Sequence, residues 1–112
     1  MKQLVKHISK SLLIAALLGG GVVAHASLAL AGKNNCLTCH QVNLSRGEVP
    51  TTLGPSFQQI AVRYRGDKTA PDKLVKKILA GGNGQWGTNN MPPQFVPDDE
   101  AKALVRWILK RK

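Results

Sequence analysis

The sequence has few of the residues from which metal and redox sites are usually built. Its only cysteines are Cys36 and Cys39, and the only histidines besides His40 are His7 and His25, both near the N-terminus. A zinc site would need a second Cys/His pair. A thioredoxin-like redox pair would need a βαβ setting, and no segment alternates like a strand. A disulfide between such close cysteines would close a loop too small to be of much value. None of these three roles suits the two cysteines.

The motif Cys36-Leu37-Thr38-Cys39-His40 instead fits the covalent attachment of haem c. Each thiol can add across one vinyl group of the porphyrin, and the two intervening residues form a single turn that matches the vinyl separation. The histidine that follows lies under the iron, where an imidazole nitrogen binds it. We predict one haem c, covalently bound through Cys36 and Cys39, with His40 as the proximal ligand.

The first 26 residues have the pattern of a cleaved signal peptide. Three lysines precede an apolar run from Leu12 to Ala24, and Ala24-His25-Ala26 is a small-x-small cleavage site. The run is short for a bilayer span and contains three consecutive glycines. We predict that residues 1–26 are removed and that residues 27–112 form one domain in the periplasm.

Two other readings of this region remain open. An uncleaved anchor could extend to Ala31, although polar residues would interrupt it. Cleavage after Ala29-Leu30-Ala31 would leave only four residues before Cys36. Cleavage after Ala26 keeps Leu28 to Asn34 for a first helical turn or two. In an exported protein, the cysteines would then serve thioether bonds rather than a disulfide.

Apolar residues at helical spacing predict a helix from about Ser56 to Arg65. Pro55 would occupy its first turn and Gly66 would stop it.

A second helix is predicted to begin near Thr69, which has capping-box spacing to Asp72, with Pro71 at the first helical position. Gly81-Gly82 would end it.

The last predicted helix opens at Pro97 with three carboxylates at the positive end of the helix dipole. It buries Trp107 as ordinary core against the N-terminal helix and ends in Lys110-Arg111-Lys112.

Helical propensity does not explain the glycine-rich segment from Gly81 to Asn90 or Met91-Pro92-Pro93 after it. No strand precedes the glycines, so a dinucleotide-binding loop is disfavoured, but such backbone can approach a flat cofactor closely. The prolines hold Met91 on rigid extended backbone. Because Met91 is the only methionine besides Met1, we predict its thioether as the second axial iron ligand.

The domain of residues 27–112 is basic, with 13 Lys and Arg (16 minus three lysines before Ser27) against 6 Asp and Glu. These charges are scattered, and no nucleic-acid-binding motif accompanies them. The charge therefore predicts acidic docking surfaces on redox partners rather than nucleic acid.

From residue 28 to residue 112 the chain resembles small bacterial class I cytochromes c with a single haem. The resemblance rests on Cys36-x-x-Cys39-His40, Gly54-Pro55, Trp86-Gly87, Met91-Pro92-Pro93, and Asp98-Asp99-Glu100-Ala101 leading to Trp107. It implies an all-α cytochrome c fold, with about four short helices wrapped around one covalently bound haem c. It also implies that the Pro55 carbonyl accepts the Nδ1 proton of His40, which leaves Nε2 for iron.

The resemblance further implies that Trp86, and Lys77 in a position often taken by arginine, donate to a haem propionate. One feature departs from the family pattern: fifteen positions separate His40 from Pro55, about six more than in the shortest relatives. We therefore expect residues 43–52 to form an enlarged surface loop near the propionate or methionine-side edge of the haem.

Iron ligated by His40 and Met91 has no vacancy for oxygen or peroxide and favours Fe(II). The sequence thus predicts a soluble, monomeric periplasmic electron carrier between respiratory partners, not an enzyme, which meets membranes only through partner complexes. Two alternatives remain: a haem subunit held permanently by an exported oxidoreductase, and a haem enzyme or gas sensor in which Met91 swings off. Pro92-Pro93 argues against the last of these.

Overall fold

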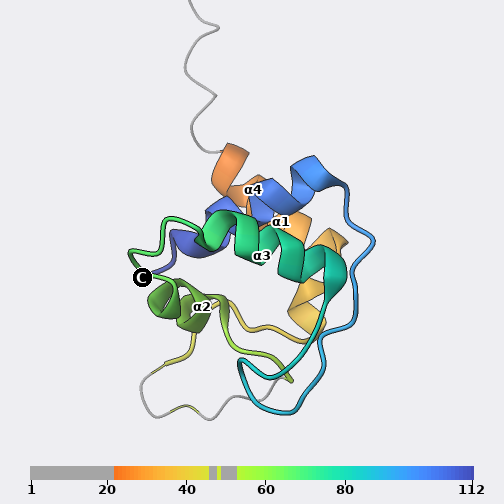
Figure 1. The fold of residues 1–112 in the computed structure, drawn as a ribbon. Helices are drawn as coiled ribbons and strands as arrows, with labels where there is room; N and C mark the ends of the chain where they lie inside the picture. The colour runs from red at the N-terminus through yellow and green to blue at the C-terminus, as the bar shows by residue number, and fades with distance from the viewer. Residues whose placement is uncertain (1–21, 46–47, 49–52) are drawn as a thin grey trace, which may run out of the picture.

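The computed structural model describes residues 22–45, 48 and 53–112. The predicted signal peptide and the enlarged loop at 43–52 therefore lie largely outside the described residues. The described part is helical and contains no β-strand, which confirms the all-α prediction (Figure 1). No helix in this part is long and apolar enough to cross a membrane. The elements in chain order are α1 (Val22–Lys33), the 3₁₀ helix η1 (Cys36–Thr38), α2 (Phe57–Arg63), α3 (Ala70–Ala80) and α4 (Asp98–Leu109).

Helix α2 begins with a capping box that the sequence analysis missed. Ser56 accepts from the Gln59 amide at 3.1 Å, and the Gln59 side chain accepts from the Ser56 amide at 2.8 Å. Pro55 therefore precedes the cap instead of sitting in the first turn, and this part of the prediction is wrong. The helix ends at Arg63, earlier than predicted, and Gly66 with φ 81° lies in the turn beyond it.

Helix α3 also starts differently from the prediction. Thr69 has near-helical dihedrals and makes no side-chain cap bond, so the predicted Thr69–Asp72 capping box is wrong. Instead, the Asp67 carboxylate accepts from the Thr69 amide at 2.8 Å and from its hydroxyl at 2.6 Å. Pro71 is the second residue of the helix, one position later than predicted, because the helix begins at Ala70. Gly81 with φ 68° ends the helix as expected.

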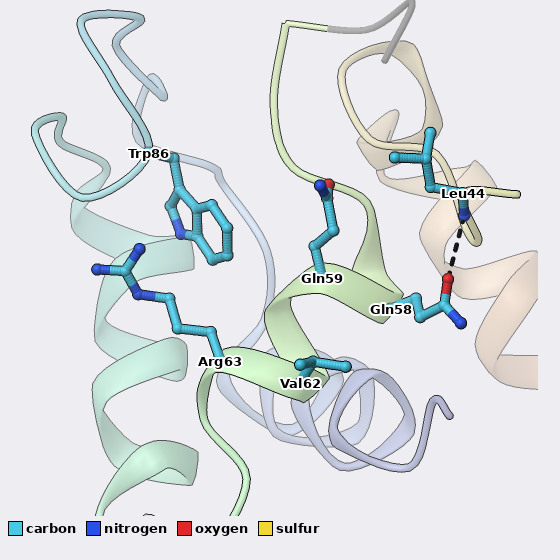
Figure 2. Close-up of a pocket in the computed structure, with 6 residues that line it drawn as sticks. All are labelled: Leu44, Gln58, Gln59, Val62, Arg63 and Trp86. Atoms are coloured by element: carbon cyan, nitrogen blue, oxygen red, sulfur yellow. Dashed lines mark hydrogen bonds between the residues drawn. The ribbon is translucent and has the colours of Figure 1, made fainter. Parts of the chain in front are cut away.

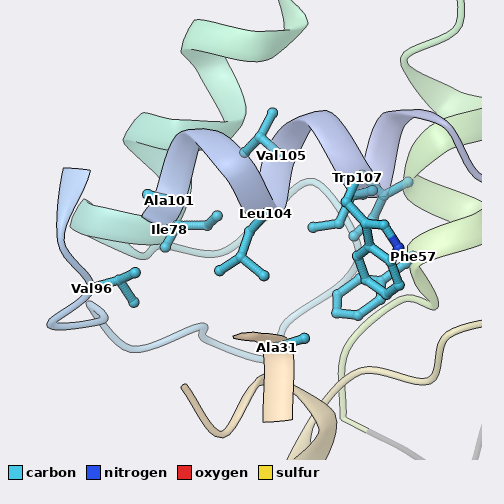
Figure 3. Close-up of a cluster of buried hydrophobic side chains, with 10 residues drawn as sticks. Ala31, Phe57, Ile78, Val96, Ala101, Leu104, Val105 and Trp107 are labelled. Atoms are coloured by element: carbon cyan, nitrogen blue, oxygen red, sulfur yellow. The ribbon is translucent and has the colours of Figure 1, made fainter. Parts of the chain in front are cut away.

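Helix α4 forms the centre of the fold, because α1, α2 and α3 all pack against it. Its Leu104 and Val105 are each 1% exposed (Figure 3). The predicted burial of Trp107 is confirmed, and its ring meets that of Phe57 from α2 edge-on, with centroids 5.4 Å apart. Ala31 brings α1 into the same cluster. The core thus joins α1, α2 and α3 to α4, the last helix of the described residues.

The start of α4 is also tied to the end of α1. The Glu100 carboxylate accepts from Lys33 Nζ at 2.6 Å and from Asn34 Nδ2 at 3.1 Å. These hydrogen bonds lower the pKa of Glu100, and the hydrogen bond from Lys33 contributes most to this effect. Because Asn34 directly precedes the turn that contains the cysteines, this contact attaches that turn to the core.

Candidate haem site

The two cysteines and His40 lie on one tight turn that follows α1. Asn35 adopts the left-handed conformation with φ 58°, which asparagine tolerates well, and this reverses the chain after the helix. The Cys39 and His40 amides then both donate to the Cys36 carbonyl, at 3.2 and 3.0 Å. Neither cysteine is in a disulfide, and both are half-buried. The turn therefore presents two free thiols and an imidazole in immediate succession.

Burial raises the pKa of the Cys36 thiol; a backbone hydrogen bond opposes the effect and Cys39 adds to it. A reactive redox pair requires the opposite, a thiol with a lowered pKa. Among the described residues, no three His, Cys, Asp or Glu side chains gather in the way that a zinc site requires. The surroundings of the cysteines therefore match neither a disulfide oxidoreductase nor a zinc centre.

The orientation of His40 is determined by two neighbours. Its Nδ1 lies 2.7 Å from the Pro55 carbonyl oxygen. A carbonyl only accepts, so Nδ1 carries the proton in this contact and the lone pair lies on Nε2. The ring also stacks on Phe57, with an interplanar angle of 21°. His40 is thus held in the tautomer that a metal-binding Nε2 needs, by the contact that the family resemblance implied.

Gly54 leaves the space in which the His40 ring sits. A Cβ at this position would lie 2.7 Å from His40 Cε1 and 2.9 Å from Nδ1, too close for any side chain. The Gly54 amide also donates to the Cys39 carbonyl at 2.8 Å. The sequence analysis noted Gly54 only within the family pattern. No local sequence signal reveals that an imidazole fills the place of its side chain.

Met91 lies on a segment that is attached to the end of α3. Its amide and carbonyl exchange hydrogen bonds with Gly82, at 3.0 and 2.9 Å, in an isolated antiparallel bridge. A Cβ at Gly81 would lie 2.3 Å from the Met91 carbonyl oxygen, so the two backbones approach closely only because Gly81 is a glycine. The Met91 side chain is partly buried against the core.

The two predicted propionate donors lie on different elements: Lys77 is in the last turn of α3, and Trp86 is in the loop formed by residues 82–91. Lys77 Nζ is 3.0 Å from the position that a Cβ of Gly82 would occupy, at the base of this loop. Trp86 lies at its tip, where its ring faces the guanidinium of Arg63 at 4.6 Å from the centroid (Figure 2). Arg63 could not be recognised from the sequence. It is 23 positions from Trp86, and a contact between residues so far apart leaves no local sequence pattern.

An open hollow lies beside Trp86 on the surface of α2 (Figure 2). Its volume is about 430 Å³, and Trp86 is the only predicted site residue that lines it. The other lining residues are Leu44, Gln58, Gln59, Val62 and Arg63.

The described residues fit a covalently attached haem. Two free thiols lie on one turn, the next residue is an imidazole with Nε2 available, and Gly54 leaves no side chain against that ring. A thioether on an anchored segment, Met91, could supply the second axial ligand.

Comparisons with known proteins agree with this geometry. The Cytochrome c family model matches residues 27–112. Cytochrome c-551 of Allochromatium vinosum is 46% identical over 87 residues, which cover 77% of this chain and 86% of that protein. Cytochrome c-552 of Hydrogenobacter thermophilus is 39% identical over 103 residues, covering 92% and 99% of the two chains. The crystal structure of wild-type Nitrosomonas europaea cytochrome c552 matches with a TM-score of 0.68 and 42% identity, over 76% of this chain and 99% of that one.

The chain therefore belongs to the cytochrome c family and has the cytochrome c fold. It resembles the small single-haem members, and haem c, bound covalently through Cys36 and Cys39, is its cofactor. Electron transfer is its general function.

Proposed function

We propose that the protein is a soluble periplasmic carrier that transfers one electron at a time between respiratory partners, with His40 and Met91 as the axial iron ligands. The observation that carries this proposal is the 2.7 Å contact between His40 Nδ1 and the Pro55 carbonyl oxygen. It commits one ring nitrogen to the backbone and reserves the other for metal. When bound, haem c supplies a one-electron Fe(III)/Fe(II) couple.

The residues around these ligands are arranged to resist movement. Pro55 holds the His40 ring, and Phe57 stacks against it. The bridge to Gly82 anchors the Met91 backbone, and two prolines stiffen the chain after it. Ligands that remain in place in both oxidation states keep the reorganisation small. This property suits transfer of electrons rather than catalysis, and we propose no enzymatic activity.

The partners are proposed to be redox proteins that dock transiently through acidic surfaces onto a monomer of this protein. The basic balance of residues 27–112 would attract them, and encounters based on complementary charge associate and dissociate quickly. Nucleic acid is not among the proposed partners, and contact with membranes is proposed only through partner complexes.

The ligand assignment is tested by visible spectra and ligand binding of the exported protein and of Met91→Ala. Wild type should show the weak sulfur-to-iron absorption band at about 695 nm that the family resemblance implies, and Met91→Ala should lose this band. Loss of the thioether should also lower the reduction potential and open a site for cyanide or carbon monoxide. Wild type that binds these ligands as fast and as tightly as the variant would overturn His/Met ligation.

A permanent haem subunit of an exported oxidoreductase is the second candidate, because the Phe95 side chain is fully exposed. A large exposed apolar side chain is common at interfaces between proteins. Co-purification at moderate salt separates the candidates. A free carrier should elute alone at the mass of a monomer, whereas a subunit should retain its partner.

A further inference from the structure

The tip of the loop formed by residues 82–91 is attached to the C-terminal end of α2. Arg63 Nη1 donates to the Gln85 carbonyl at 2.8 Å, and the Tyr64 hydroxyl donates to Gln85 Oε1 at 2.6 Å. The Arg63 guanidinium also faces the Trp86 ring, 4.6 Å from its centroid, as Figure 2 shows. One arginine therefore contacts two consecutive residues of the loop.

The other contacts of the loop hold its backbone rather than the indole of Trp86. All residues from 83 to 90 are exposed, so apolar burial does not anchor them. Gly84 and Gly87 have positive φ values, and the Gly84 amide donates to the Gly87 carbonyl at 3.1 Å, which closes a turn around Gln85 and Trp86. Asn89 Nδ2 also donates to the Leu53 carbonyl at 3.1 Å. The bridge between Gly82 and Met91 closes only the base of the loop. The position of the indole thus depends on its contact with α2.

The charge of Arg63 is not neutralised by a carboxylate in the described part of the chain. The ion pairs found there are Lys33–Glu100, Lys73–Asp67 and Lys102–Asp98. A guanidinium stays protonated at any physiological pH and still has donors to offer after bonding one carbonyl. A carboxylate that accepts from Trp86 Nε1 would lie close to this charge.

We propose that Arg63 is a positioning residue of the haem site: it holds Trp86 at the tip of the loop and, in addition to Lys77, provides a fixed cation that keeps a haem propionate ionised. This inference rests on the proposed haem-carrying function and on the family resemblance, which implies that Trp86 and Lys77 donate to a propionate. A cation next to a carboxylate lowers its pKa, and next to a haem it favours Fe(II). Arg63 therefore stabilises both the ionised propionate and the reduced protein.

The experiment measures the reduction potential of the purified haem protein between pH 4 and 9. At neutral pH and a fixed solution potential, Arg63→Gln should lower the ratio of reduced to oxidised protein by about threefold. This is the effect expected for the loss of one partly screened positive charge. The pH range over which the potential changes should also move upward, because the propionate loses one of its two cations and keeps only Lys77. Arg63→Lys keeps the charge but not the planar fork, so it should restore most of the pH profile.

Arg65→Gln is the matched control, since it removes the same charge from an exposed side chain two residues further along. It should leave the pH profile at its wild-type position. An equal shift in Arg65→Gln, or no shift in Arg63→Gln, would overturn the inference. Trp86→Phe separates this failure from failure of the proposed propionate contact. If Trp86→Phe shifts the profile and Arg63→Gln does not, only the role of Arg63 is wrong; if neither does, the propionate contact of Trp86 is wrong.

Discussion

At the scale of single residues, the haem site depends on the absence of a Cβ at two glycines as well as on the ligand side chains. His40 can lie against the Pro55 carbonyl only because residue 54 has no Cβ. The close approach of the Met91 segment to the end of α3 has the same cause at Gly81. Both glycines act by leaving space for a neighbour.

Gly54→Ala should therefore damage the site. The new methyl would stand 2.7 Å from the His40 ring, so the ring or the backbone must move. We expect a loss of about 1–3 kcal/mol in the free energy of unfolding, as for other overpacked sites, and a weakening of the proposed bond between His40 and iron. Denaturant titration followed by circular dichroism and by the haem absorbance measures both effects.

Gly32→Ala is the control for this substitution. Gly32 lies in α1, and the nearest atom to its added Cβ is Leu37 Cδ1 at 3.9 Å, an ordinary contact. It should leave the haem absorbance unchanged and stabilise the protein by about 0.5–1 kcal/mol, since alanine favours helix over glycine. Equal stability of Gly54→Ala and wild type would show that the space beside His40 is not needed.

At the scale of elements, α3 depends on a side chain that lies outside the helix. The pKa of Asp67 is lowered to about 2, mainly by the Thr69 hydroxyl and then by Lys73. A lowered carboxyl pKa in the folded state means stability that is present above the unfolded value. This contribution should be lost as the pH falls from the ordinary value of 3.8 towards about 2.

Asp67→Asn should reduce stability at neutral pH and flatten the decline of the unfolding midpoint between about pH 4 and pH 2. Thermal unfolding at a series of pH values measures this. Asp72→Asn is the control on the same helix, because its carboxylate is not the one that caps Thr69. A larger effect at position 72 than at position 67 would favour the capping box expected from the sequence and contradict the role of the Asp67–Thr69 hydrogen bonds.

At the scale of the whole molecule, the N-terminal helix is joined to the core by residues that follow the predicted cleavage site. Ala31 is completely buried, and Lys33 and Asn34 both bond Glu100. A mature protein that starts at Ser27 keeps all these contacts. We predict this N-terminus, and the intact mass of the exported protein measures it. A product that starts at Gly32 would lose Ala31 from the core and contradict the prediction, as would one that retains residues 1–26.

Docking is the other property of the whole molecule. We expect electron exchange with an acidic partner to slow as salt rises, because screening weakens the attraction to a basic protein. Phe95→Ser should slow the exchange further without changing the reduction potential, since this exposed ring lies four residues after Met91. Stopped-flow rates at several ionic strengths test both, with Leu28→Ser on α1 as an exposed apolar control. Equal rates for Phe95→Ser and wild type would exclude Phe95 from the docking surface.

The sequence by itself determined covalent haem attachment and the approximate positions of the later helices. Two cysteines and a histidine in immediate succession predict haem attachment because the reaction requires that spacing, and apolar periodicity located α3 and α4 within a few residues. These signals are local, so neighbouring residues suffice to read them. The residues that cap each helix were harder to assign. Ser56 caps α2, whereas Thr69 and Asp67 both suit a capping role before α3, and only the backbone path decides which of these two side chains accepts the hydrogen bonds.

The tertiary structure decided what lies next to what. Three contacts join residues that are not neighbours in the sequence. They are the approach of the His40 ring to Gly54, the contact of Arg63 with the Trp86 ring, and the bridge between Gly82 and Met91. Such contacts depend on the packing of α1, α2 and α3 against α4, which no periodicity within one segment encodes. The sequence alone thus predicts His40 and Met91 as iron ligands and, through the resemblance, Pro55 as the acceptor for His40. The contacts of Gly54, Phe57 and Gly82 with these residues required the fold.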